Sequence, residues 1–463
     1  MLDMYNQVSE VRTSPDFSIG GNKIFFISLG CPRNLVDSEV MLGILLRAGY
    51  EPSERLEDAD HIVINTCGFL KASRDESLRT INEALEQRKE GAKVIVTGCM
   101  VQSHKEMITS PVDYFLGSGD VEGILDAVRS GEKGEQVTNA RSYLEAGEVP
   151  RTLSTPKHFA YLKIAEGCRK RCAYCIIPTI KGPLKSKPVE RVLKEFRVLL
   201  NQGAKEVILI AQDLGDWGKD IGFKRTDGLI HLLKELLKEE GDYWLRLMYL
   251  YPDEITDDLI QLMKEEPRIC PYIDMPIQHV NDDMLKSMHR ATNREQIVGT
   301  IEKMREEVPD ITIRTSLIVG FPGETEEQFE ELAGFLEDYK LDNVGVFQFS
   351  REPGSYAYDL PDQISEEVKQ ERYDRLMQIQ QKIVEQEQKK WVGRVLDVVI
   401  EGYHPETRVL MVGRHRGQCP EIDGQVLIND ASGVDAFGKR YQVEITDVSS
   451  YDLIGRVLPG SGK

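Results

Sequence analysis

The first third of the chain alternates short apolar runs with longer amphipathic stretches. Three runs, KIFFISLGC (23–31), HIVINTCGF (61–69) and KVIVTGCM (93–100), each reach a cysteine, and helical patterns follow over 35–48 and 73–90. This alternation predicts a doubly wound parallel α/β domain with helices on the faces of the sheet. Because ligands bind outside the carboxyl ends of parallel strands, Cys31, Cys67 and Cys99 are expected to meet there. Three cysteines buried only for packing are the alternative.

Six further apolar runs mark the middle of the chain, beginning near residues 158, 206, 243, 272, 312 and 343. Helical patterns separate them near 189–202, 227–239, 256–265, 282–306 and 325–338. Six strand–helix units are fewer than the eight of a closed barrel, so a partial, open-sided (βα)6 barrel of the TIM type is predicted. Its chemistry is expected at the carboxyl ends of the strands.

Two connecting segments and a third pattern complete the chain. Residues 131–157 are rich in Gly, Glu, Ser and Thr and lack periodicity, which predicts a linker. Residues 363–390 predict a charged, solvated amphipathic helix. From Trp391 onward, short alternating runs predict a small antiparallel β-barrel. The expected domains are therefore 22–135, 155–388 and 391–460.

Composition narrows the partners and the compartment. The formal net charge is −19, and residues 391–463 hold 8 Lys/Arg against 10 Asp/Glu, so bulk nucleic acid is an unsuitable main partner and contact with it is expected only indirectly. No apolar run is long enough for a membrane span, and residues 1–21 read as a polar extension rather than a secretion signal, so a cytoplasmic protein without membrane contact is expected. In that compartment, grouped cysteines indicate metal binding or redox work rather than disulfides.

The strongest motif is Cys168-Arg-Lys-Arg-Cys172-Ala-Tyr-Cys175. Three thiolates this close can bind one 4Fe–4S cluster and leave its fourth iron without a protein ligand. An open coordination position is how a metal site meets its substrate. A zinc knuckle is the competing interpretation, but it would want a fourth Cys or His, and none lies nearby in sequence.

The CxxxCxxC spacing, with Tyr174 before the last cysteine, resembles the radical S-adenosylmethionine (SAM) superfamily. With a three-cysteine N-terminal domain and a small terminal barrel similar to a TRAM domain, the chain looks like a methylthiotransferase. The resemblance implies a partial barrel, SAM as cofactor and an open iron that chelates it. It also implies a second 4Fe–4S cluster on Cys31, Cys67 and Cys99.

Two branches of that family compete. The stretch SLGCPRNLVDSE around Cys31 and the PEIDG at 420–424 are similar to the RimO type. That resemblance implies methylthiolation at the β-carbon of an aspartate in the twelfth small-subunit ribosomal protein. One SAM supplies the methyl group, a second supplies the radical, and an electron donor such as flavodoxin or ferredoxin is needed. The alternatives are a transfer-RNA adenosine methylthiotransferase of the MiaB type and a non-catalytic iron–sulfur protein for electron transfer or scaffolding.

Weaker signals suggest cofactor contacts and carry alternatives of their own. The cysteine motif provides Tyr174, and a strand end provides Gln212 and Asp213. A glycine-rich turn provides Gly320, Gly323 and Glu324, although an ordinary Pro-Gly turn is equally compatible with these three. No catalytic residue is expected beyond the cluster ligands, and His279 is expected to be structural. Where the family tends to carry arginines, this chain has three lysines, Lys181, Lys185 and Lys187, which cannot bind a carboxylate through two parallel hydrogen bonds, so the family's detailed substrate contacts are not transferred to them. Two cysteines, Cys270 and Cys419, match no cluster position and are expected to be structural.

Overall fold

The computed structural model describes residues 21–139, 141–145 and 149–462. They form two compact units that divide after Thr152, and each is considered separately. The N-terminal extension expected over residues 1–21 lies, except for Gly21, outside the described residues.

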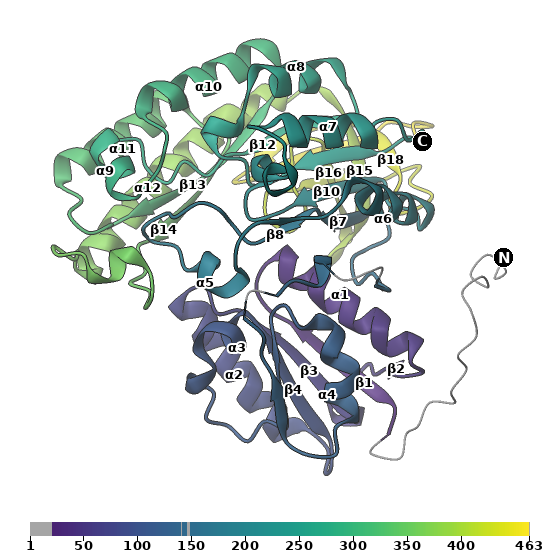
Figure 1. The fold of residues 1–463 in the computed structure, drawn as a ribbon. Coiled ribbons are helices and arrows are strands. Elements are labelled where there is room, and N and C mark those ends of the chain that lie inside the picture. Colours follow the sequence, from purple (N-terminus) through teal and green to yellow (C-terminus); the bar gives the residue numbers. More distant parts are fainter. Residues whose placement is uncertain (1–20, 140, 146–148, 463) are drawn as a thin grey trace. The chain divides into compact units, whose positions relative to one another are not determined.

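The first unit is built on a six-stranded, fully parallel sheet in the order β2-β1-β3-β4-β5-β6 (Figure 1). The chain order reverses between β1 and β3, as in doubly wound folds. The strands are β1 (Lys23–Ser28), β2 (Glu51–Pro52), β3 (His61–Thr66), β4 (Lys93–Gly98), β5 (Tyr114–Gly117) and β6 (Gly134–Gln136). The helices are α1 (Pro32–Arg47), α2 (Lys71–Gln87), α3 (Cys99–His104) and α4 (Ile124–Arg129).

Alternation along the central strands distributes apolar side chains to both faces of this sheet. Val63 packs with the buried side chains of α1 and α4, whereas Ile62 and Ile64 pack on the opposite face with α2 and α3. All six residues of β3 are buried, as expected for a parallel strand covered on both sides. The doubly wound prediction is therefore confirmed.

The segment expected to be a linker, 131–157, is structured in part. It contributes β6, and Tyr143 and Leu144 are buried in the core of the first unit. Further along, the Arg151 guanidinium lies 2.6 Å from the Glu39 carboxylate, and both side chains are buried. The linker prediction was wrong here because β6 (Gly-Glu-Gln) has no apolar pattern to reveal it.

The second unit begins with a six-stranded parallel sheet in the order β14-β13-β12-β11-β10-β7, which confirms the partial barrel. A short antiparallel pair, β8 (Ala165–Glu166) and β9 (Lys185–Ser186), flanks the cysteine motif. The sheet strands are β7 (Phe159–Lys163), β10 (Glu206–Ile210), β11 (Trp244–Leu247), β12 (Ile269–Asp274), β13 (Thr312–Val319) and β14 (Asn343–Gln348). The helices are α5 (Ile177–Lys181), α6 (Val189–Asn201), α7 (Asp227–Leu236), α8 (Asp257–Glu265), α9 (Asp282–Ser287), α10 (Arg294–Glu307) and α11 (Glu326–Tyr339).

One predicted helix is in fact two. The stretch 282–306 breaks between α9 and α10, where His289 adopts a left-handed backbone conformation with φ 57°. Asn293 then caps α10 by accepting from the Gln296 N–H, and the Gln296 side chain accepts from the Asn293 N–H. This capping box starts a new helix that hydrophobic periodicity alone does not separate.

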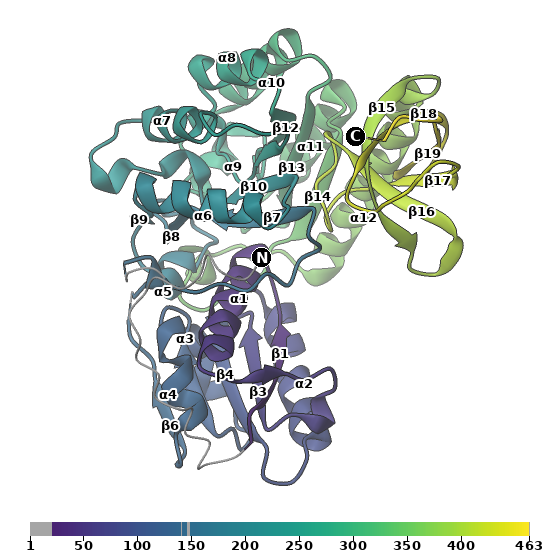
Figure 2. The same cartoon turned by 90° about the vertical axis from the view of Figure 1, so that its right-hand side faces the viewer.

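The chain ends in helix α12 (Glu366–Glu387) and a closed five-stranded barrel, which Figure 2 shows beside α12 and β14. The prediction of a solvated helix over 363–390 was wrong, because Leu376, Ile383 and Val384 of α12 are buried. The barrel is not fully antiparallel either: β17 and β19 pair in parallel. A closed ring with an odd number of strands must contain a parallel pair. The strands are β15 (Val395–His404), β16 (Thr407–His415), β17 (Val426–Asp430), β18 (Arg440–Ser449) and β19 (Asp452–Val457).

The closed barrel packs against the amino-terminal ends of the parallel strands. The carboxylate of Glu206, the first residue of β10, forms ion pairs with the guanidinium groups of Arg246 from β11, at 2.5 Å, and Arg414 from β16, at 2.9 Å. All three side chains are buried, and the two guanidinium groups lower the pKa of Glu206 although burial raises it. Asp423 accepts a hydrogen bond from the Tyr272 hydroxyl at 2.8 Å. The carboxyl ends of the strands are thereby left to the cysteine motif.

Candidate cluster-binding sites

The three N-terminal cysteines lie at neighbouring strand ends. Residues Ser28 and Asn65 are paired between β1 and β3, and Thr66 is paired with Gly98 between β3 and β4. Cys67 and Cys99 directly follow β3 and β4, and Cys31 is three residues beyond β1, at the start of α1. The structure therefore brings together the three thiols at the point where the strand order reverses, which is the usual ligand site of such sheets.

The Asn34 side chain connects all three cysteine-bearing segments. Its amide nitrogen donates to the Leu29 carbonyl at 3.0 Å and to the Thr66 carbonyl at 2.9 Å. Its amide oxygen accepts from Cys99 Sγ at 3.6 Å. At 2% exposure, this amide is shielded from water, so these bonds fix the relative positions of the three loops.

The electrostatic surroundings of these thiols differ. Burial raises the pKa of Cys31, but the Arg33 guanidinium and the backbone N–H groups of Arg33 and Asn34 together outweigh this effect, and the net pKa lies below the usual value. Burial raises the pKa of Cys67 above its usual value. Because metals bind the thiolate, Cys31 is the thiol of this pair that is better prepared to ligate before any metal arrives.

The second triad lies on the loop between β8 and α5, at the carboxyl edge of the partial barrel. Cys168 Sγ accepts from the Lys170 N–H and Cys175 Sγ from the Ile177 N–H, both at 3.4 Å. Cys172 Sγ lies 3.1 Å from the Tyr251 hydroxyl. Cys168 and Cys175 therefore each have a backbone donor, and Cys172 has a hydroxyl within hydrogen-bond distance, the environment in which iron–sulfur clusters are held.

Both triads suit a cubane better than a single zinc ion. Tetrahedral zinc, with Zn–S bonds of about 2.3 Å, would draw its sulfurs to roughly 3.8 Å from one another. In the part of the chain that the structure describes, the only group of three or more potential ligands with atoms all within 4.8 Å is Asp213, Asp216 and Glu254. The cysteine sulfurs are spread more widely, and three of them leave one corner of a cubane for a reactant.

That carboxylate group is bridged by lysines. Lys170 Nζ lies 3.0 Å from Glu254 and 3.2 Å from Asp213, and Lys219 Nζ bridges Glu254 and Asp216 at 2.6 and 2.7 Å. Burial raises the pKa of Asp213 to about 7, in spite of Lys170. Because Lys170 stands between two cysteines of the motif, the network anchors the cysteine loop to the ends of β10 and β11.

The predicted cofactor contacts fall at the same edge. Gln212 follows β10, and its buried Oε1 has no hydrogen-bond partner among the described residues. An unpaired buried acceptor beside the Asp213 carboxylate fits the ammonium group of an amino acid such as the one in SAM. Tyr174 lies within the cysteine loop and is partly buried. These positions support Gln212, Asp213 and Tyr174 as candidates, and their contact with the cofactor stays a prediction.

The glycine-rich turn is held mainly by its own glutamate. Glu324 accepts from the Gly320 N–H at 2.6 Å and from Arg372 at 2.6 Å, and its other oxygen lies 3.2 Å from His279 Nε2. Gly320 and Gly323 have φ values of 72° and 82°, which only glycine adopts without strain. The Glu324 carboxylate thus shapes the loop, and the backbone of the loop is the part that remains for a ligand.

The lysines that depart from the family pattern are engaged within the fold. Lys181 Nζ lies 2.9 Å from the buried Glu166 carboxylate, and Lys187 pairs with Glu195. Lys185 belongs to β9. Cys270 and Cys419 are fully buried, as expected for structural cysteines.

Three residues beside the thiols escaped prediction. Tyr251 and Arg290 flank Cys172, and the Arg290 guanidinium lies 3.9 Å from the centroid of the Tyr251 ring. Burial raises the pKa of Tyr251 well above its usual value, so its hydroxyl keeps its proton. Tyr251 lies in the segment after β11, as Gln212 lies in the segment after β10. Because ligands bind beyond the carboxyl ends of such strands, this position could have identified Tyr251 as a candidate site residue. Asn34 belongs to the Pro-Arg-Asn stretch that marks the family resemblance, but the sequence did not indicate its role in holding the cysteine loops.

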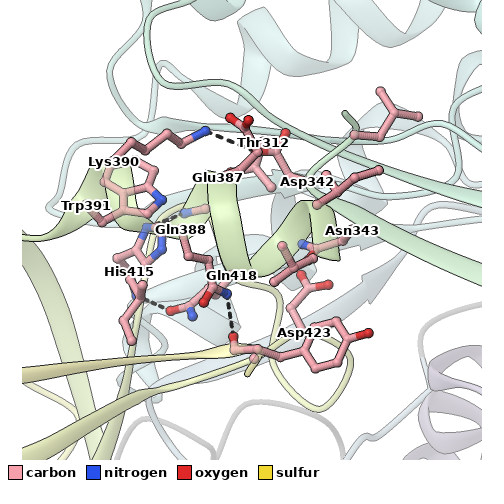
Figure 3. Close-up of a pocket in the computed structure, with 17 residues that line it drawn as sticks. Thr312, Asp342, Asn343, Glu387, Gln388, Lys390, Trp391, His415, Gln418 and Asp423 are labelled. Atoms are coloured by element: carbon pink, nitrogen blue, oxygen red, sulfur yellow. Dashed lines mark hydrogen bonds and ion pairs between the residues drawn. The ribbon is translucent and has the colours of Figure 1, made fainter. Parts of the chain in front are cut away.

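A cavity elsewhere in the second unit does not match this chemistry. It lies between the amino ends of β13 and β14, α12 and the closed barrel, with Trp391 and His415 on one wall (Figure 3). Its volume of about 50 Å³ is far below the several hundred Å³ of cofactor pockets. It also lies at the edge of the sheet opposite to the cysteine motif. In the described part of the chain, no helix is both long and apolar enough to cross a membrane.

Comparisons with known proteins agree with this geometry. Residues 162–336 match the radical SAM superfamily, residues 23–117 match the uncharacterized protein family UPF0004, and residues 392–458 match the TRAM domain. A cobalamin- and [4Fe-4S]-bound structure of the radical SAM methyltransferase TsrM from Kitasatospora setae superposes with a TM-score of 0.54 over 73% of this chain and 77% of that chain, at 14% identity. This likeness concerns the fold alone.

Relatives named ribosomal protein uS12 methylthiotransferase RimO are far more similar in sequence. The relative from Protochlamydia amoebophila is 68% identical, covering 96% of this chain and 94% of its own. Those from Chlamydia pneumoniae and Bdellovibrio bacteriovorus are 56% and 44% identical, over 96% and 94% of this chain and 95% and 97% of theirs. Nothing in these matches favours the transfer-RNA branch or a non-catalytic protein. The chain therefore belongs to the RimO family of radical SAM methylthiotransferases, enzymes that use an iron–sulfur cluster and SAM.

Proposed function

We propose that this chain methylthiolates the β-carbon of one aspartate in ribosomal protein uS12, consuming two molecules of SAM. The observation that carries the proposal is a pair of separate three-cysteine sites, each at the carboxyl edge of a parallel sheet, in a chain 68% identical to a uS12 methylthiotransferase. We assign one 4Fe–4S cluster to Cys31, Cys67 and Cys99 and a second to the CxxxCxxC cysteines. The proposed domains are 22–135, 155–388 and 391–460, with the first extended toward Thr152 because Tyr143 and Leu144 lie in its core.

When bound, the CxxxCxxC cluster supplies the electron that cleaves SAM, and SAM supplies the radical and the methyl group. The residues of the chain position these reactants. Gln212 and Asp213 offer acceptors to the SAM ammonium group, and the backbone of the Gly320–Gly323 turn lies at the same edge. A β-C–H bond is not acidic enough for a side-chain base, so no general base is assigned.

The N-terminal site prepares the sulfur that is transferred. Arg33 favours the thiolate of Cys31, and Asn34 holds the three cysteine segments in register. Three protein ligands leave one corner of a cubane for that sulfur. In this proposal the N-terminal triad holds the transferred sulfur, and the CxxxCxxC triad holds SAM.

The remaining partners follow from chemistry and charge. The electron comes from a low-potential one-electron protein such as flavodoxin or ferredoxin, and the reaction takes place in the cytoplasm. A formal net charge of −19 suits docking to a basic ribosomal protein. Nucleic acid would be contacted only through the ribosome.

The test is anaerobic reconstitution of the full chain with iron and sulfide, followed by reaction with uS12, SAM and a reductant. Mass spectrometry should locate one methylthio group on one aspartate, and iron analysis should find enough for two cubanes. The Cys67→Ala variant should keep SAM cleavage and lose methylthiolation. Iron for a single cubane, or zinc in its place, would refute the two-cluster assignment, and unmodified uS12 in a reaction that cleaves SAM would refute the substrate.

A further inference from the structure

The donors around the CxxxCxxC sulfurs are of two kinds. Cys168 and Cys175 accept from backbone N–H groups of their own loop, at 3.4 Å. Cys172 Sγ instead contacts side chains: the hydroxyl of Tyr251, 79 residues away in sequence, lies 3.1 Å from it, and Tyr174 and Arg290 also hydrogen-bond it. A side-chain donor can be removed by substitution without changing the backbone of the loop.

Two cationic side chains lie against the Tyr251 ring. Lys170 Nζ lies 4.3 Å from the centroid of the Tyr251 ring, and the Arg290 guanidinium lies 3.9 Å from it. Cations over an aromatic ring are held by its electron-rich face and withdraw electron density from it. The phenol hydroxyl is thereby made a stronger hydrogen-bond donor toward Cys172.

We propose that Tyr251 is a positioning residue for the radical-generating cluster: its hydroxyl donates a hydrogen bond to the Cys172 sulfur and favours the reduced cluster. This inference rests on the proposed function, in which Cys172 ligates that cluster. The reduced cluster holds one more electron, taken from the low-potential donor, and its sulfurs carry more negative charge. Hydrogen bonds to those sulfurs therefore stabilise the reduced state more than the oxidised state and raise the reduction potential. No proton is transferred.

The informative variant is Tyr251→Phe, which keeps the ring and its two cations and removes the hydroxyl. We expect unchanged iron and sulfide content and a lower midpoint potential. At a fixed potential, the ratio of reduced to oxidised cluster should fall about tenfold, the effect of one charge-assisted hydrogen bond and equal to about 59 mV for a one-electron couple.

The measurement is an anaerobic redox titration of the full chain, followed by electron paramagnetic resonance in the absence of SAM. The Cys31→Ala/Cys67→Ala/Cys99→Ala background removes the signal of the other cluster. Tyr403→Phe is the matched control, because Tyr403 is half-exposed on the closed barrel and should leave the potential unchanged. SAM cleavage by Tyr251→Phe should be slow with a weak reductant and recover with a stronger one.

Each outcome decides the matter. An unchanged or higher potential in Tyr251→Phe, with the cluster intact, would overturn the inference. Loss of iron from Tyr251→Phe would also overturn it, because the residue would then serve assembly rather than potential. Failure of the proposed function is distinguishable, since it would appear in the parent chain as a missing cluster or absent SAM cleavage.

Discussion

Replacing Asn34 by alanine tests how the N-terminal cysteines are held together. The substitution removes two hydrogen bonds donated to the Leu29 and Thr66 carbonyls and one accepted from Cys99. The bond to Thr66 is buried, and losing its donor should cost about 2 kcal/mol, whereas water can partly replace the donor to Leu29, at about 1 kcal/mol. The expected loss in the free energy of unfolding of the first unit is therefore about 3 kcal/mol.

The distribution of tryptophan makes this loss measurable in the full chain. All three tryptophans, at 217, 244 and 391, belong to the second unit, so their fluorescence follows that unit, whereas circular dichroism follows both. In Asn34→Ala, the dichroism transition of the first unit should move down by about 6–12 °C while the fluorescence transition stays in place. The reconstituted variant should also retain iron for only one cubane.

Asn82→Ala is the matched control. Asn82 is an exposed asparagine on α2 of the same unit, and water can replace the hydrogen bond that it accepts from Ser110, so its loss should change the free energy of unfolding by less than about 0.5 kcal/mol. If Asn34→Ala unfolded like the parent chain and bound iron for two cubanes, the three loops would not depend on this amide, and the reasoning would be refuted.

Three further predictions concern the second unit. Cys172→Ala should abolish formation of 5′-deoxyadenosine, measured by chromatography, while the iron of the N-terminal site remains. Glu206→Gln leaves the buried Arg246 guanidinium without its carboxylate and Arg414 with Glu401 alone, so urea unfolding followed by fluorescence should show a loss of about 3–5 kcal/mol. His415→Gln should flatten the pH dependence of stability. Burial, with nearby arginines, lowers the pKa of His415 to about 3, so the unfolded chain binds a proton below about pH 6.5 that the folded chain does not. The contribution of this site to parent stability therefore falls as the pH drops below about 6.5, with a slope that approaches about 1.4 kcal/mol per pH unit near about pH 5.

Each of these predictions has an outcome that contradicts it. Residual 5′-deoxyadenosine in Cys172→Ala would mean that this sulfur is not a required ligand. A Glu206→Gln chain as stable as its parent would mean that the ion pairs merely balance their desolvation. Parallel stability curves for His415→Gln and the parent would show that His415 is protonated in the folded chain.

The central strands and the cysteine positions could be predicted because their signals are local. β3 is a continuous apolar run that is buried on both faces, and Cys168, Cys172 and Cys175 identify one another by spacing. Strands β5 and β6, at the far edge of the first sheet, have only four and three residues, too few for a periodic pattern. In the first sheet, the local signals therefore revealed the central strands and missed these edge strands.

The residues around the sulfurs could not be predicted because their partners are distant in sequence. Tyr251 is 79 residues from Cys172, and Arg414 is 208 residues from Glu206. Such pairs are created by the packing of the chain, and a single sequence holds no record of them. Asn34 lies only three residues from Cys31, but its role depends on Thr66, which only the folded sheet brings within reach.

The position of Arg414 has a consequence for how such chains can be recombined. Its charge completes an ionic centre that joins Glu206 and Arg246 of the parallel sheet to Glu401 of the barrel. A gene fusion that exchanged residues 391–463 for an unrelated module would therefore leave the Glu206–Arg246 pair without its second arginine. We therefore expect residues of the barrel that face the parallel sheet to be exchanged only together with their partners, whereas its outward loops can vary independently.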